Sequence, residues 1–167
     1  MALRFTKVLV GAALMTPMLL AVDATVAPTA APVQALSADI VISQVYGGGG
    51  NAGATFQHDF VELFNRGTAT ASLAGMSVQY ASATGTGNFA ANPVVPLAGS
   101  LAPGQYYLVR QAGGTIGAAS PTPDVTGTAN MSGTAGKVAL VTSTSGLACN
   151  GGSTPCSAPQ LAQIKDL

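Results

Sequence analysis

The sequence predicts an all-β protein whose strands form an antiparallel sandwich. Residues 39–64 read as a strand, a glycine loop and a second strand. Several further short strand-like runs follow, with Gly, Pro, Ser and Thr signals for turns between them. Beyond the N-terminal segment, no sustained 3.6-residue period indicates a helix, except over the last few residues. Short strands separated by turn signals are typical of an antiparallel sandwich.

The first strand pair has the clearest pattern. Ile40–Tyr46 is rich in β-branched residues, which suit a half-buried pleated surface. Gly47–Gly50 should end this strand, because glycine is costly in a regular element and tolerates unusual φ values. Phe60–Phe64 alternates, so that Val61 and Leu63 share one face. The two runs therefore predict neighbouring strands joined by a glycine-rich loop.

Later segments continue the β pattern. Leu101–Gly104 predicts a turn with Pro and Gly at its centre. Phe89 is a lone apolar anchor in a polar loop, and residues 112–135 form a second long polar loop. The expected strands are Met76–Tyr80, a short edge strand at 94–97 flanked or interrupted by prolines, Gln105–Arg110 and Lys137–Thr142.

Composition limits the function. The 167 residues suffice for one domain, only 7% of them are charged, and the formal net charge is zero. An electrostatic nucleic-acid binder needs clustered Lys and Arg, so direct nucleic-acid binding is not expected. Disorder driven by charge repulsion is not expected either.

The N-terminus predicts an export signal. Arg4 and Lys7 precede the apolar run Val8–Val22, which is too short and interrupted for a membrane span of about 20 apolar residues. We expect a signal-peptide helix and an Ala/Pro-rich cleavage region over residues 1–35, with an uncleaved anchor as the alternative. Cleavage is expected after Ala24 or Ala35, and the later site is preferred because the intervening residues lack a strand pattern. The mature domain, residues 36–167, would be secreted, extracellular or periplasmic, with no membrane span after cleavage.

Two cysteines fit that compartment. Cys149 and Cys156 enclose six residues that include two glycines and a proline. In an exported protein this arrangement predicts a disulfide across a turn. A zinc site would need two further ligands nearby, and the sequence has none there.

His58, Asp59 and Glu62 are the only concentrated ionisable set. A metal hydrolase needs several ligands converging on one ion, but His58 is the only histidine, and Asp59 and Glu62 should point to opposite faces of a strand. We therefore expect no catalytic or metal-binding residues and no cofactor. Asp59 is interpreted as a residue at the start of a strand, and Glu62 as holding a backbone or arginine partner.

Other motifs for chemistry are incomplete. The glycines at 47–53 have no following Lys and no helix, so they are not a phosphate loop. Asn51, Asp59 and Asp124 could contribute to a calcium site, but a flexible loop is the favoured interpretation. No G-x-S-x-G elbow occurs. The tyrosines could form a stacking face for sugar or peptide, or could simply pack on the sheet; they are Tyr46, Tyr80, Tyr106 and Tyr107.

The chain resembles the lamin-tail domain from about Ser37 to its C-terminus. Five segments occur in the family's order: DIVISQVYGGGG, DFVELFNRG, SLAGMSVQY, LAPGQYYLV and GKVALV. The resemblance implies an immunoglobulin-like β-sandwich, as found in nuclear lamins and in secreted bacterial proteins. It also implies a structural rather than catalytic role for the residues that match the second segment, namely Asp59, Glu62, Asn65 and Gly67.

The glycine-rich loop is similar to the bacterial branch of this family, in which the domain often precedes an endonuclease/exonuclease/phosphatase-type hydrolase. The resemblance implies a non-catalytic exported module that attaches to a protein or cell-surface component and tethers or positions a partner enzyme. One alternative is the N-terminal fragment of a secreted nuclease or phosphodiesterase whose catalytic domain follows residue 167. A structural component of a surface layer is another.

By the same resemblance, Gln163–Leu167 would begin a closing strand that the chain does not finish. Lys137–Thr142 and Gln105–Arg110 are then expected to carry an unpaired edge. The domain is expected to be truncated at its C-terminus and marginally stable for that reason.

Overall fold

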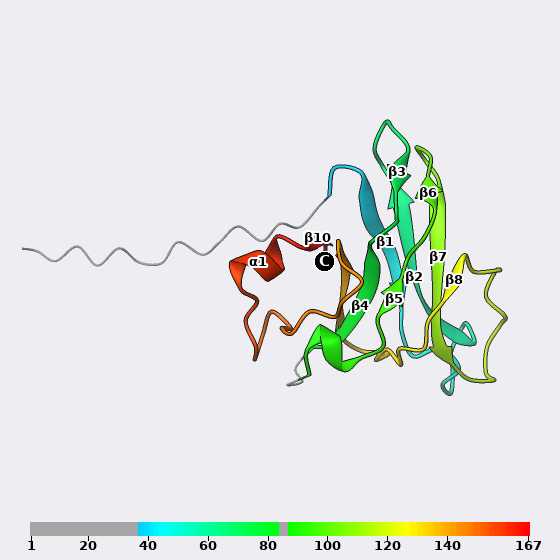
Figure 1. The fold of residues 1–167 in the computed structure, drawn as a ribbon. Helices are drawn as coiled ribbons and strands as arrows, with labels where there is room; N and C mark the ends of the chain where they lie inside the picture. Colours follow the sequence, from blue (N-terminus) through cyan, green and yellow to red (C-terminus); the bar gives the residue numbers. More distant parts are fainter. Residues whose placement is uncertain (1–36, 84–86) are drawn as a thin grey trace, which may run out of the picture. The chain divides into compact units, whose positions relative to one another are not determined.

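The computed structural model describes residues 37–83 and 87–167 (Figure 1). The expected signal peptide and cleavage region, residues 1–35, lie outside the described residues. The described residues form two four-stranded sheets, one two-stranded pair and two very short helices. The chain is thus an all-β, immunoglobulin-like sandwich, as the sequence predicts.

The first sheet has the strand order β1-β2-β7-β8. These strands are β1 (Ile40–Tyr46), β2 (His58–Asn65), β7 (Tyr106–Gly113) and β8 (Val125–Thr126). Its strands pair antiparallel, except that β8 runs parallel to β7. This parallel pair departs from the strictly antiparallel sandwich that the sequence predicts, and β8 lies in what was expected to be a polar loop.

The second sheet has the order β10-β9-β4-β5. Its members are β10 (Ile164–Asp166), β9 (Gly136–Val141), β4 (Ser77–Ser82) and β5 (Val95–Pro96). The short pair β3 (Ala71–Ser72) and β6 (Ser100–Leu101) lies at the opposite end of the strands from the 3-10 helix η1 (Phe89–Ala91) (Figure 1). The other helix, α1 (Ala158–Leu161), directly precedes β10.

The main core lies between the two sheets. Val61 and Leu63 are fully buried there, which confirms the alternation predicted for β2. Val78 and Leu140 contribute to the same core from the second sheet. Burying each such side chain stabilises the fold by about 1.5–3 kcal/mol, so this interface is the main source of stability.

The second sheet is buried on its other face as well. Ala139 and Val141 of β9 belong to a separate apolar cluster with Phe89, Cys149 and Ile164. Helix η1 and segments that follow β9 thus cover the outer face of the sheet. Phe89, which the sequence presents as a lone anchor in a loop, is a fully buried member of this second core.

The turn before β7 has the geometry that its sequence predicts. The N–H of Gln105 donates to the carbonyl of Ala102 at 3.1 Å, and Gly104 has a φ of 76°. A positive φ at the third position, after Pro103 at the second, defines a type II turn, which favours glycine there.

The expected unpaired edges are absent from the described residues. β9 lies between β10 and β4, and β7 lies between β2 and β8. The prediction that these two strands would each have an open edge is wrong, because the last residues and the long loop before β9 both supply short strands. The open edges of the first sheet are instead those of β1 and β8.

Candidate functional site

Asp59 links three parts of the chain. It lies on β2 beside an irregularity in the pairing with β7 and is almost fully buried. Its Oδ1 accepts the N–H of Gly49 at 2.6 Å, and its Oδ2 accepts the N–H of Met131 at 2.7 Å. Both carboxylate oxygens are therefore occupied by backbone donors, so Asp59 positions the loops on either side of it.

The glycine loop is held in place by this contact and by close packing. A Cβ on Gly47 would lie 2.2 Å from the carbonyl oxygen of Ser132, and a Cβ on Gly49 would lie 2.2 Å from the carbonyl carbon of His58. Such distances are far inside any normal contact, so these positions require glycine. The loop packs against the chain around Ser132.

Asn65 and Gly67 organise the opposite end of β2. The buried Asn65 amide donates to the carbonyls of Ala69 and Leu101 at 2.9 and 2.8 Å. Its Oδ1 accepts the N–H of Gly67 at 2.9 Å. The side chain thereby ties the end of β2 to the turn that follows it and to β6.

Glu62 has a different kind of partner from the one expected. Its Oε1 accepts the hydroxyl of Ser43 at 2.7 Å, on the outer face of the first sheet. No arginine or backbone group takes that place among the described residues. The contact spans a β-bulge in β1, where the register shifts between Ile42 and Gln44.

The two cysteines form the predicted disulfide. Cys149 and Cys156 are bonded and belong to the apolar cluster on the outer face of the second sheet. The bond therefore closes a segment that covers the sheet.

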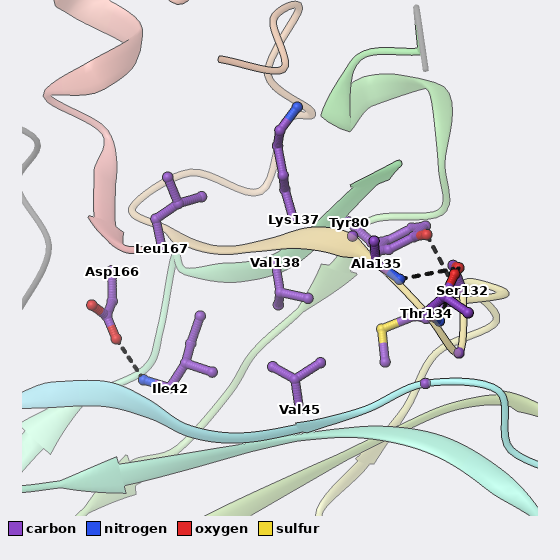
Figure 2. A pocket seen from close by; sticks show the side chains of 14 residues that line it. Ile42, Val45, Tyr80, Ser132, Thr134, Ala135, Lys137, Val138, Asp166 and Leu167 are labelled. Carbon is purple, nitrogen blue, oxygen red and sulfur yellow. Dashed lines mark hydrogen bonds between the residues drawn. The ribbon is translucent and has the colours of Figure 1, made fainter. Parts of the chain in front are cut away.

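A cleft of about 570 Å³ lies where β1 of the first sheet faces β9 and β10 of the second (Figure 2). Ile42 and Val45 project into it from β1, and Val138 projects toward them from β9. Lys137 points away from them on the other side of β9. The remaining lining residues are Gly47, Tyr80, Met131, Ser132, Gly133, Thr134, Ala135, Gly136, Asp166 and Leu167.

The backbone of β1 is open along this cleft. Val45 lies opposite Val61 of β2. The N–H of Asn65 donates to the carbonyl of Gln105, on the β7 side of β2. Backbone groups in a strand alternate between its two neighbours, so Val61, four residues before Asn65, also directs its N–H and C=O toward β7. The N–H and C=O of Val45 must then face away from β2, along the edge of the sheet. Its side chain is 47% exposed, which is high for a large apolar residue in a strand.

Comparison with protein families adds an independent finding. The family model of the Lamin Tail Domain matches residues 34–152, which is more than half of the chain. The chain belongs to the lamin-tail domain family. Lamin-tail domains are immunoglobulin-like and non-catalytic. No curated protein matches this chain.

The family match does not extend over the whole of this lamin-tail domain. It ends at residue 152, before Cys156, helix α1 and strand β10. These parts are nevertheless integrated into the fold, because β10 pairs with β9 and Cys156 is bonded to Cys149. The segment beyond the match is what closes one end of the cleft.

That closure depends on two acidic residues. The buried Asp166 of β10 accepts the outward N–H of Ile42 at 2.7 Å (Figure 2). Lys165 forms an ion pair with Asp39 at 2.6 Å, just before β1 begins. The Lys165 ammonium and the Ser37 hydroxyl hold the pKa of Asp39 well below its usual range. β10 thus occupies part of the β1 edge, and the edge around Val45 stays open.

The acidic residues that the structure describes do not form a metal site. Over residues 37–83 and 87–167, no three His, Cys, Asp or Glu side chains gather in a way that could hold a metal ion. Asp59, one member of the possible calcium set, has both oxygens engaged, whereas Asp124 lies beside β7 and accepts the N–H of Leu108. In the same part of the chain, no helix has the length and apolarity needed to cross a bilayer.

The cleft itself is a feature that the sequence does not reveal. Val45 is an ordinary strand valine in the sequence, and Asp166 is 124 residues away from its partner Ile42. Of the residues singled out from the sequence, Tyr80 lines the cleft and its hydroxyl accepts the N–H of Ser132 at 3.0 Å, and Asp59 holds Met131 in the wall.

Proposed function

We propose that this lamin-tail domain is a non-catalytic attachment module of an exported protein of the bacterial branch. Its role would be to tether or position a partner enzyme, such as an endonuclease/exonuclease/phosphatase-type hydrolase, or a cell-surface component. The non-catalytic family and the disulfide are compatible with this role. The signal-like N-terminus supports export.

The open edge at Val45 carries the proposal. A strand edge presents unpaired N–H and C=O groups, and an extended segment of a partner can add to it as a further strand. In such complexes the backbone provides affinity, and pockets for alternate side chains provide specificity. Here the cleft beside Val45, lined by Ile42 and Val138, would accept apolar side chains of the partner.

A proline substitution isolates the backbone contribution. Val45→Pro removes the outward N–H but leaves the pairing of β1 with β2 intact, because that N–H does not bond to β2. Val45→Ala is the matched control, since it shortens the side chain and keeps the donor. Peptides selected from a displayed library on the exported protein would be tested against both variants and against the parent.

We expect peptides with alternating apolar residues to perturb the backbone amide resonances of β1. Val45→Pro should weaken their binding at least tenfold, and Val45→Ala by less. Peptides that bind equally well to Val45→Pro, or that leave the β1 amides unchanged, would argue against strand addition. Sequencing of the N-terminus of the exported material, expected near Leu36, tests the export part of the proposal.

A further inference from the structure

A second cavity, of about 370 Å³, lies on the outer face of the first sheet. Its walls include the aromatic rings of Phe56, Phe60 and Tyr106 and the carboxylates of Glu62 and Asp124. It differs from the cleft described above, because it lies on a sheet face and not along a strand edge. No role assigned so far to this lamin-tail domain uses it.

One aromatic wall of the cavity is preorganised. Tyr46 stacks on Phe60 with ring centroids 5.3 Å apart, and Phe56 packs edge-on against both rings. The Tyr46 hydroxyl also accepts the backbone N–H groups of Thr55 and Phe56 at 2.9 and 3.1 Å. These contacts hold the ring of Phe56 against the sheet, so this wall does not have to order when a ligand binds.

The opposite wall is Tyr106, whose side chain is 59% exposed and packs against Phe64 with ring centroids 4.7 Å apart. Glu62 and Leu108 lie opposite one another in the register between these walls. Along the strands, Phe60 and Tyr106 each lie two residues from the Glu62–Leu108 pair. With a strand rise of about 3.3 Å per residue, each aromatic residue is therefore about 6.6 Å from that pair along the strand direction. A cation above Leu108 would thus be close to the ring distance of about 6 Å at which cation–π attraction acts.

The charge of the lining is one-sided. Glu62 uses Oε1 for Ser43, and Asp124 uses Oδ2 for the N–H of Leu108 at 2.7 Å. The second oxygen of each carboxylate has no hydrogen bond within the described residues. No lysine or arginine lines the cavity. Arg110, two residues along β7, donates to Thr126 and forms no ion pair within the described part of the chain.

We propose that this cavity binds an organic cation, specifically a quaternary ammonium group such as that of choline. Aromatic rings around a site with ionised carboxylates attract a cation that carries apolar substituents, since the rings contact its methyl groups and the carboxylates balance its charge. An anion would be repelled by Glu62 and Asp124. A bare metal ion would find only two carboxylates among aromatic walls.

Choline is the probe, and its uncharged isostere 3,3-dimethyl-1-butanol is the matched ligand control. Binding would be followed by amide and aromatic resonances of the exported protein at low salt. We expect choline to shift resonances of Tyr106, Leu108 and Glu62, and the isostere to bind at least fivefold more weakly. Glycerophosphocholine, added as a third arm, tests whether the group is recognised on a headgroup or as the free cation.

Two variants test the residues of the cavity, and two others are controls. Tyr106→Leu removes the exposed ring, and Glu62→Gln with Asp124→Asn removes both charges but keeps an acceptor for each internal hydrogen bond. Each should weaken choline binding about tenfold. Leu161→Ala, an exposed apolar residue on α1 away from the cavity, is the matched control and should leave binding unchanged. Val45→Pro should also leave it unchanged, so that failure of strand addition and failure of this site are distinguishable.

Several outcomes would overturn the proposal. These are the absence of choline-dependent shifts at these residues, equal binding of choline and its isostere, and unchanged affinity in the doubly neutralised variant. Binding of an uncharged disaccharide such as cellobiose at the same residues, without binding of choline, would reassign the cavity to a neutral glycan. Wild-type-like spectra of the variants away from the cavity would establish that they are folded.

Discussion

Single buried polar residues determine how the loops of this domain are arranged. Asp59 is nearly fully buried, and its side chain makes two hydrogen bonds to the backbone. Asn65 is fully buried, and its side chain makes three. A buried polar group that loses its partner costs about 1–3 kcal/mol, so such residues are sensitive to conservative change. By contrast, Glu62 makes its contact on an exposed face.

We predict that Asp59→Asn destabilises the domain by about 2–3 kcal/mol. An amide has one acceptor oxygen, so one of the N–H groups of Gly49 and Met131 would face an NH₂ group and stay unpaired. Glu62→Gln is the control and should cost less than about 0.5 kcal/mol. Chemical denaturation of both variants measures the difference, and equal midpoints would contradict this role of Asp59.

At the scale of elements, the parts that follow β9 are held by a covalent bond and by an ion pair. The disulfide closes the segment over the second core, and Lys165 joins β10 to the start of β1. Each contact has one partner beyond residue 152, where the family match ends. The stability of this end of the domain therefore depends on contacts that involve residues beyond the family match.

Reduction of the disulfide should lower the melting temperature. The bonded cysteines are seven residues apart, and the chain-entropy relation gives about 2.5 kcal/mol for a loop of this size. We expect a mass increase of about two daltons on reduction, since two hydrogens are added, together with a lower melting temperature. The variant Cys149→Ala/Cys156→Ala should melt at the same temperature with and without reductant. A reduced wild type that melts like the oxidised protein would contradict the prediction.

The ion pair between Lys165 and Asp39 predicts that the stability of the domain depends on pH. Folding lowers the pKa of Asp39. The contribution of its ion pair to the free energy of unfolding is therefore fully present above the unfolded pKa of about 3.9, and it is lost as the pH falls toward the folded pKa. The pair is partly exposed, so its contribution should not exceed about 1 kcal/mol.

We therefore expect Lys165→Met to melt below the parent at neutral pH and low salt, with a difference that shrinks below about pH 4. Lys137→Met is the control, since Lys137 forms no ion pair within the described residues. A difference for Lys165→Met that is constant over this pH range would show that the charge of Asp39 does not contribute.

At the scale of the whole molecule, the second sheet is a middle layer. Its inner face packs on the first sheet, and its outer face is covered by η1 and the disulfide-bonded segment, with Ile164 of β10 in the same cluster. Removing the end of the chain would expose both the outer cluster and the edge of β9. An exposed edge of this kind promotes association with other strands.

A chain that ends at residue 152 should melt at a lower temperature and self-associate. It lacks Cys156, α1 and β10, and it leaves the N–H of Ile42 without Asp166. Ile164→Ala in the 167-residue chain is the control, because it removes core volume, at a cost of about 2–5 kcal/mol, but keeps β10. Light scattering and thermal unfolding provide the readout. A monomeric short chain as stable as the parent would contradict the middle-layer interpretation.

Membership of a non-catalytic family predicts a lack of hydrolase activity. DNA, RNA and phosphate esters should be turned over no faster than in buffer, with or without Mg²⁺, Mn²⁺ or Zn²⁺. His58→Ala is the diagnostic variant. Turnover by the parent that is lost in His58→Ala would contradict the non-catalytic interpretation.

Local chemistry by itself determined the fold class and most strand positions. Ile40–Tyr46 agrees residue for residue with β1, and the turn at Pro103-Gly104 follows from backbone preferences of those two residues. The disulfide could be predicted because only two cysteines are available. Two-residue alternation and turn preferences act over a few neighbouring residues, so they can be read directly from the sequence.

Tertiary structure alone decided which groups meet across the chain. The carboxylate of Asp59 bonds to a backbone group 72 residues away, and that of Asp166 to one 124 residues away. The continuous apolar run at 138–141 is compatible with burial on both faces, but it does not say which segment covers the second face. Hydrogen bonds and burial between remote segments depend on how the sheets pack. For that reason the cleft at Val45 and the aromatic cavity at Tyr106 emerge only from the folded structure.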